Sequence, residues 1–249
     1  MKTHVRSCLA AAGLALLCGV SPLRADYSST VTSFSPLGYW RFDEATTSPP
    51  LNSVANSGTL GSAADGYVVL DVGKGIPGIV GSALSFTNVG GVVGDCHAKV
   101  DVAFSKALNP ASFSVEFWLK PTTLGGDTTG AAIFSSLNPN GFGGANRQGV
   151  VIYLTDTGLI QFRLGLNSGY AGALNSTSGA LVTGTWKHVV CTYDGTTQRI
   201  YINGVAAGTL ATSATGTGWL PNSQAITRLG GTVLNGSATY APVLTRPAI

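Results

Sequence analysis

Carboxylates are the residues of this sequence that could perform hydrolytic chemistry. The chain has two glutamates: Glu44 follows Asp43 directly, and Glu116 stands among aromatic and apolar residues. Enzymes that cleave glycosidic bonds place two carboxyl groups across a cleft. No second carboxylate lies near Glu116 in the sequence, so only a distant aspartate could complete such a pair. The sequence therefore argues against an enzyme and leaves that distant pairing open.

Histidine and cysteine patterns give no stronger catalytic or zinc signal. A serine triad needs a histidine that activates the serine, and after residue 25 the chain offers only His97 and His188. His188 lies in an expected strand beside Trp186, where a surface or hydrogen-bonded core histidine is the simpler interpretation. The chain has no His-Glu-x-x-His or Cys-x-x-Cys spacing, so a zinc site is unsupported.

One glycine-rich segment formally matches a dinucleotide-binding pattern. Residues 73–78 read Gly-Lys-Gly-Ile-Pro-Gly, and the pattern requires a strand before it and a helix after it. Pro77 and a strand-like segment at 83–86 leave no room for that helix. We therefore interpret the segment as a glycine-rich loop.

The composition favours a turn-rich β protein. Only 10% of the 249 residues are charged, against about 25% in typical domains, which argues against a nucleic-acid partner. Glycine accounts for 34 residues, about twice its usual share. The length fits one large β domain or two small ones.

The first 25 residues have the three parts of a secretory signal peptide. Lys2 and Arg6 precede an apolar stretch at 9–20, and the small Ala25 ends the segment. That stretch is shorter than the ~20 residues of a membrane-spanning helix, and no later stretch approaches this length. The segment holds three of the 14 basic residues, so 11 basic and 11 acidic residues remain. We expect cleavage after Ala25 and a protein that is secreted or located at the cell surface or in the periplasm.

Export leaves two cysteines, Cys96 and Cys191. In an oxidising compartment a disulfide could join them. Two separate buried thiols are the alternative, since the sequence separation gives no geometric support for pairing.

The folded part is expected to begin near residue 37, after a polar lead-in at 26–36. Residues 113–120 alternate between apolar and polar side chains, and Pro121 ends the run. This period of two predicts a strand with one apolar face.

Two turn dipeptides predict a meander of three strands. Asp194-Gly195 and Asn203-Gly204 separate alternating segments, and such dipeptides adopt the positive φ angles of tight hairpins. We count about ten short strands, which predict two packed antiparallel sheets; the others are at 39–42, 67–72, 83–86, 99–102, 150–154, 159–166 and 225–229.

Five segments in order resemble a known family. The chain is similar to a LamG-like (laminin G type 3), concanavalin A-like jelly-roll domain of bacterial exported proteins, over roughly residues 37 to 233. The resemblance implies an all-β jelly-roll sandwich, usually one module of a longer chain. Related laminarinase-type enzymes carry a Glu-x-Asp-x-x-Glu strand that this sequence lacks. The matching segments are 39–44 (YWRFDE), 81–86 (GSALSF), 113–121 (FSVEFWLKP), 185–195 (TWKHVVCTYDG) and 200–204 (IYING).

The end of the chain departs from the family pattern. Such domains close with a strand resembling Asp-Gly-x-Ile-Asp-Glu-Val-x-Ile-Tyr, and nothing after Leu229 matches it. We therefore expect residues 37–249 to form a jelly-roll domain without its closing strand, in a fragment or a product whose last strand is lost or replaced. An unpaired sheet edge would then remain near residues 39–42.

The resemblance also implies two kinds of ligand. Several lectin-like sandwiches bind calcium through loop carboxylates, for which Asp95 and Asp127 are the candidates. A carbohydrate would stack on an exposed aromatic side chain, and Trp118, Tyr170 and Trp219 are the candidates for that role. The alternative for Trp118 is a place in the core.

These observations lead to three functional hypotheses. The first is an exported, non-catalytic binding or adhesion module that recognises carbohydrate or another surface ligand, including a surface protein. The second is a structural module that spaces other domains of a longer surface protein. The third is a polysaccharide hydrolase or lyase.

Overall fold

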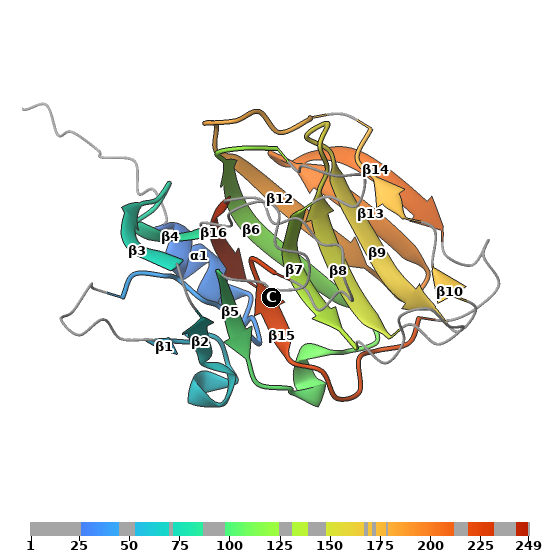
Figure 1. The fold of residues 1–249 in the computed structure, drawn as a ribbon. Helices are drawn as coiled ribbons and strands as arrows, with labels where there is room; N and C mark the ends of the chain where they lie inside the picture. Colours follow the sequence, from blue (N-terminus) through green and yellow to red (C-terminus); the bar gives the residue numbers. More distant parts are fainter. Residues whose placement is uncertain are drawn as a thin grey trace, which may run out of the picture.

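In the computed structural model, two antiparallel sheets face each other (Figure 1). The predicted signal peptide, Asp95, Cys96 and Asp127 lie outside the described residues. For 166, 169–170 and 243–248 the description covers the backbone alone. The structure describes residues 26–44, 53–69, 72–86, 98–124, 131–138, 148–166, 169–170, 173–177, 179–211, 219–231 and 243–248.

Each sheet has antiparallel pairing between all neighbouring strands. The nine-stranded sheet has the order β1 (Ser53–Val54), β2 (Gly66–Val69), β5 (Lys99–Val102), β15 (Thr227–Leu229), β7 (Ala131–Leu137), β8 (Gly149–Leu154), β9 (Ile160–Leu166) and β10 (Gly169–Tyr170), and β11 (Leu174–Asn175) also pairs with β9. The seven-stranded sheet has the order β14 (Val205–Ala211), β13 (Thr197–Ile202), β12 (Lys187–Tyr193), β6 (Phe113–Pro121), β16 (Val243–Ala248), β4 (Ser82–Phe86) and β3 (Val72–Pro77). The predicted all-β sandwich of two antiparallel sheets is confirmed.

The core fills the space between the sheets, and β6 shows how the sequence builds it. Val115, Phe117 and Leu119 are at most 1% exposed and belong to the main apolar cluster. The side chains between them point to the outer face of the sheet, because successive residues of a strand alternate in direction. Each such buried apolar side chain stabilises the fold by about 1.5–3 kcal/mol.

The meander β12–β13–β14 has the predicted turns. Asn203 and Gly204 both have positive φ, 52° and 77°, and Gly195 has φ 98°. Ile202 pairs with Val205 directly across the Asn203-Gly204 turn. The hairpin prediction from the two dipeptides is confirmed.

The amino-terminal lead-in contains a helix that the sequence analysis did not predict. Helix α1 (Tyr27–Ser33) has seven residues, and its Val31 packs with Tyr39 in a small separate cluster. Two short 3-10 helices, η1 (Gly61–Ala64) and η2 (Lys106–Leu108), complete the helical elements of the described residues. Among these residues, no helix is long and apolar enough to cross a membrane.

The two ends of the predicted domain differ from expectation. A strand does follow Leu229: β16 lies between β6 and β4, so the prediction of a missing closing strand is wrong for this structure. The segment 39–42 is no strand of either sheet. Tyr39 and Trp40 are isolated bridge residues, Trp40 opposite Asn56, and the aromatic side chains of the segment are fully buried. The predicted unpaired sheet edge at this segment is therefore not found.

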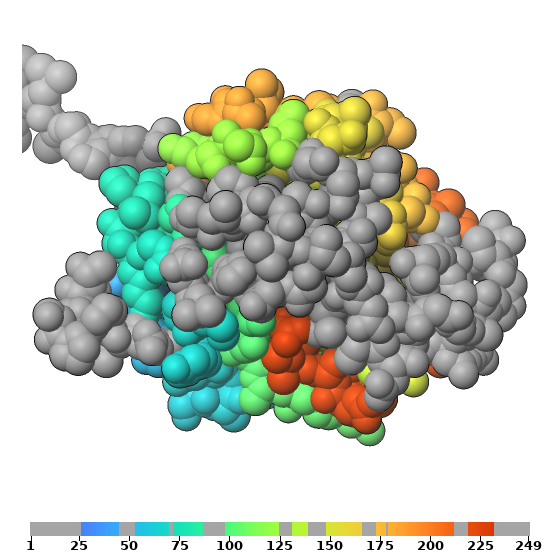
Figure 2. All heavy atoms as spheres, in the orientation of Figure 1, coloured from blue at the N-terminus to red at the C-terminus, as the bar shows by residue number. Residues whose placement is uncertain are grey.

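The sequence analysis missed β7 of the nine-stranded sheet, as it missed β16 and also β3, which covers most of the segment 73–78 interpreted as a glycine-rich loop. The outward-facing Ala132 and Leu137 of β7 form a second buried cluster with Val151 and Tyr153 of β8. Since both faces of β7 are buried, its sequence shows no alternation. In the space-filling view, described residues 219–231 reach the surface beside the segment around η2, in keeping with the pairing of β15 and β5 (Figure 2).

Candidate functional site

The outer face of the seven-stranded sheet carries the ionisable groups of the candidate site. Outward-facing residues of β6 lie beside those of β12, and the register places Trp118 opposite His188 and Glu116 opposite Val190. Glu116 and His188 are therefore diagonal neighbours on adjacent strands. At this spacing long side chains reach each other.

Tyr27, Glu116, Trp118 and His188 form one contact group, the Glu116 cluster. The Tyr27 hydroxyl donates a hydrogen bond to Glu116 Oε1 over 2.6 Å, and His188 Nε2 lies 2.9 Å from the same oxygen. The Trp118 ring centroid lies 5.0 Å from the His188 ring and 6.3 Å from the Tyr27 ring. Two strands and helix α1 thus hold one carboxylate in a fixed orientation.

The surroundings shift the ionisation of this carboxylate. Burial raises the pKa of Glu116, but hydrogen bonds from His188 and Tyr27 outweigh that effect and hold the pKa below its ordinary value. Burial, and next the hydrogen bond to Glu116, raise the pKa of the Tyr27 hydroxyl. Glu116 therefore keeps its negative charge, and Tyr27 remains a protonated donor.

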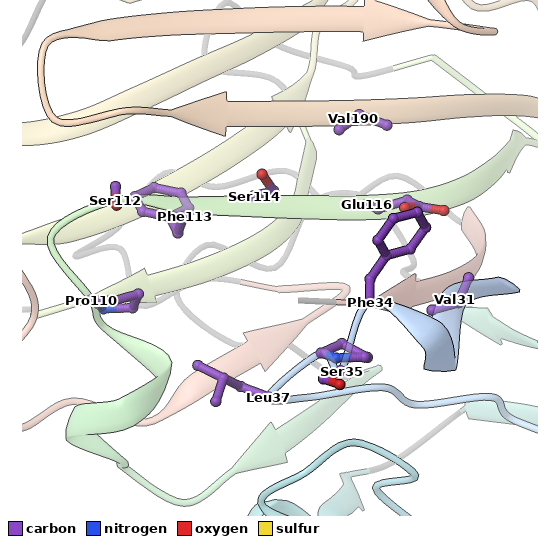
Figure 3. Close-up of a pocket in the computed structure, with 11 residues that line it drawn as sticks. Val31, Phe34, Ser35, Leu37, Pro110, Ser112, Phe113, Ser114, Glu116 and Val190 are labelled. Atoms are coloured by element: carbon purple, nitrogen blue, oxygen red, sulfur yellow. The ribbon is translucent and has the colours of Figure 1, made fainter.

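A groove lies next to this cluster, between the chain from Val31 to Leu37 and the outer face of β6 and β12 (Figure 3). Its volume is about 470 Å³, within the range of small-molecule sites, about 300–1,000 Å³. We call it the α1 groove. Its lining residues are Val31, Phe34, Ser35, Pro36, Leu37, Pro110, Ser112, Phe113, Ser114, Glu116 and Val190.

The lining combines an exposed aromatic ring with polar groups. Phe34 ends helix α1 and is 81% exposed; it lines the groove together with Glu116 (Figure 3). Ser112 and Ser114 add hydroxyl groups from the start of β6. Glu116 uses Oε1 for both of its contacts, and its Oε2 accepts no hydrogen bond from the described residues. The groove therefore offers an apolar surface and hydrogen-bonding groups side by side.

Two of the predicted carbohydrate-binding aromatics, Trp118 and Trp219, lie in different surroundings. Trp118 lies half-buried in the Glu116 cluster, on the outer face rather than in the core. Trp219 packs on Phe113 at 5.0 Å and Tyr193 at 5.7 Å between ring centroids, so it supports the main core. Tyr170 lies in β10, and its side chain is not among the described ones.

The predicted metal and disulfide residues have different outcomes. Asp95 and Asp127 lie outside the described residues, and within the described part no three His, Cys, Asp or Glu side chains gather to hold a metal ion. Calcium binding stays a prediction. Cys191 is a free, buried thiol, so the structure does not contain the disulfide considered above.

Sequence reasoning missed the helical wall of the groove. Residues 26–36 were assigned as a polar lead-in because serine and threonine dominate them. Tyr27, Val31 and Phe34 nevertheless recur at i, i+4 and i+7, the spacing of one helix face. That pattern was the available, though short, signal for the helix; it does not specify where the helix docks on the sheet.

Comparison with known families agrees with this fold. A family model of the concanavalin A-like lectin/glucanases superfamily matches residues 94–244, more than half of the chain. The chain belongs to this superfamily. A comparison with curated protein sequences gives no match.

Solved structures with the same fold include a domain of an arabinanase and parts of two toxins. Domain 4 of AbnA, an extracellular arabinanase from Geobacillus stearothermophilus solved with arabinotriose, has 16% identity and a TM-score of 0.57, with 86% of this chain and 92% of that chain covered. The binding domain of Paraclostridial Mosquitocidal Protein 1 has 14% identity and a TM-score of 0.59, with 86% and 48% covered. Botulinum neurotoxin type C, whose cell entry depends on two ganglioside molecules, has 14% identity and a TM-score of 0.60, with 89% and 48% covered. The chain spans about half the length of these two toxin chains, and such identities show a shared fold alone.

Proposed function

We propose that the chain is an exported, non-catalytic glycan-binding module and that the α1 groove is its binding site. The observation that carries the proposal is that exposed Phe34 and the oriented carboxylate of Glu116 line the same groove. A sugar ring has an apolar face that packs on an aromatic ring and hydroxyl groups that donate to a carboxylate. Sites for small ligands combine these two features.

The absence of a second carboxylate supports the non-catalytic part of the proposal. Glu116 is the one carboxylate among the described residues that line the groove. Glycoside hydrolysis requires two carboxyl groups about 5–9.5 Å apart. Glu116 is also already engaged with Tyr27 and His188, which suits a fixed acceptor better than a proton donor.

The structural relatives support glycan binding by analogy. AbnA domain 4 was solved with arabinotriose, and botulinum neurotoxin type C interacts with gangliosides. Because a shared fold does not fix a ligand, the proposal depends on the groove and not on these relatives.

Glycan-array binding and titration calorimetry on the secreted chain test the proposal. Phe34→Ala should lower the affinity for a bound oligosaccharide by about five- to tenfold, because an aromatic contact contributes about 1 kcal/mol. Tyr67→Ala is the matched control, since Tyr67 is an exposed aromatic on β2 of the other sheet, 57% accessible. Equal effects of the two substitutions, or release of reducing sugar from a polysaccharide, would contradict the proposal.

A further inference from the structure

The charge of the α1 groove restricts which glycans it can hold. The lining consists of apolar residues, three serines and Glu116, so a carboxylate is the one ionisable group among the described residues that line it. Apolar surroundings strengthen the field of such a charge, because they lower the local dielectric constant. The groove therefore presents a negative potential to any ligand that fills it.

Glu116 keeps an uncompensated negative charge while His188 is neutral. Tyr27 is a neutral donor at Oε1, and His188 contacts the same oxygen, with which it forms an ion pair only when its ring is protonated. A carboxylate has two oxygens and about four acceptor sites, so Oε2 retains its capacity to accept. A ligand cation placed there would gain a charge-assisted hydrogen bond.

Nearby cationic side chains of the described residues have other contacts. Arg199 on β13 forms an ion pair with Asp194 over 2.6 Å, and Lys120 on β6 lies over the Trp186 ring at 5.6 Å. Neither residue lines the groove. An anionic sugar would therefore meet Glu116 with no cation from the described lining to offset the repulsion, and such a mismatch excludes ligands.

From this arrangement we infer that the α1 groove recognises glycans with a protonated amino group, with Glu116 Oε2 as the acceptor, and rejects carboxylated or sulfated glycans. The inference rests on the proposed function, because it assigns a ligand class to the same groove. Phe34 supplies affinity for the sugar ring, and Glu116 supplies the selection by charge.

A matched set of oligosaccharides of equal length tests the inference by calorimetry, at a pH where the amine is protonated. The set is a glucosamine oligomer, its N-acetylated form, an uncharged glucose oligomer and an oligouronate. The glucosamine oligomer should bind at least about tenfold more tightly than the N-acetylated form, and the oligouronate should not bind. Added salt should reduce the affinity of the glucosamine oligomer alone, because screening acts on the charge contact.

Two variants separate selection by charge from sugar binding in general. Glu116→Gln should remove the preference for the amine, whereas Phe34→Ala should weaken all bound oligomers about equally. Circular dichroism and the melting temperature establish that each variant folds. If Glu116→Gln does not fold, the salt dependence of oligosaccharide binding by the wild-type chain still tests the inference. Equal affinity for the first two oligomers, or binding of the oligouronate, would overturn the inference and leave the proposed function standing. If no oligosaccharide binds, the proposed function itself fails.

Discussion

The outer faces of the two sheets differ in what lies on them. On the seven-stranded sheet, the outward residues of β6 are polar or half-buried and include Glu116 and Trp118. On the nine-stranded sheet, the outward residues of β7 and β8 include Ala132, Leu137 and Val151, which are at most 5% exposed. The first sheet therefore covers the core with one face, whereas the centre of the second is buried on both faces.

This difference decides where chemistry can occur. A face that is packed with apolar side chains stabilises the sheet and has no groups that reach a ligand. The outer face of β6 holds an oriented carboxylate next to a groove of about 470 Å³. We therefore expect substitutions on the two faces to act on different properties, stability on one and binding on the other.

The largest expected effect is a charge placed on the buried outer face of β7. Leu137→Asp should destabilise the fold by about 3 kcal/mol or more, because an unpaired charge would be buried. Denaturant unfolding measures the loss. Thr209→Asp is the control on the other sheet, where Thr209 is exposed and lies opposite Arg199; its stability should change by less than about 0.5 kcal/mol. Similar losses in both variants would remove the distinction between the faces.

A smaller effect is expected from Gly149, which begins β8. Gly149 has φ 94°, and a side-chain carbon there would collide with the backbone carbonyl oxygen of Ser136. Gly149→Ala should therefore cost about 2–3 kcal/mol. Gly204→Ala in the open β13–β14 turn should cost only about 1 kcal/mol, since its φ is 77° but no atom lies within 4 Å. Equal melting temperatures of these two variants would contradict the prediction.

The same contrast explains which parts of the fold the sequence reveals. In β6 one face is open, so Val115 and Phe117 alternate with polar residues and the strand was predicted correctly. In β7 both faces are buried, and the run AAIFSSL has no period of two to detect. Strand β16 contains Pro247, which cannot donate a ladder hydrogen bond, and tertiary pairing alone places it in the sheet.

The candidate site was predicted only in part. Trp118 was named for its aromatic ring, but its neighbours Tyr27 and His188 come from elements 91 positions before and 70 positions after it in the chain. Such a cluster depends on strand register and on the docking of α1, neither of which local sequence patterns specify. Phe34 was missed because a seven-residue helix is too short for its apolar spacing to stand out.

The next effect concerns pH and the Glu116 cluster. The folded-state pKa of Glu116 is lowered, so its contribution to stability is present above the unfolded-state pKa of about 4.3 and is lost as pH falls through the folded value. At neutral pH the free energy of unfolding of the wild-type chain should therefore be about 1 kcal/mol higher than that of Glu116→Gln. This difference should disappear in acid. Denaturant unfolding as a function of pH measures this. A stability difference between the two chains that grows in acid would contradict a lowered pKa of Glu116.

The smallest effect is expected on the inner face of β12, where alkylation of Cys191 in the native protein should be undetectable. Cys191 lies between the outward-facing Val190 and Thr192 and is fully buried. This burial raises the pKa of its thiol. Thiols react as thiolates, so in a Cys96→Ser variant the native chain should resist alkylation and react completely after denaturant is added. Mass spectrometry counts the modified thiols. Rapid modification of the native variant would show that β12 does not bury this face.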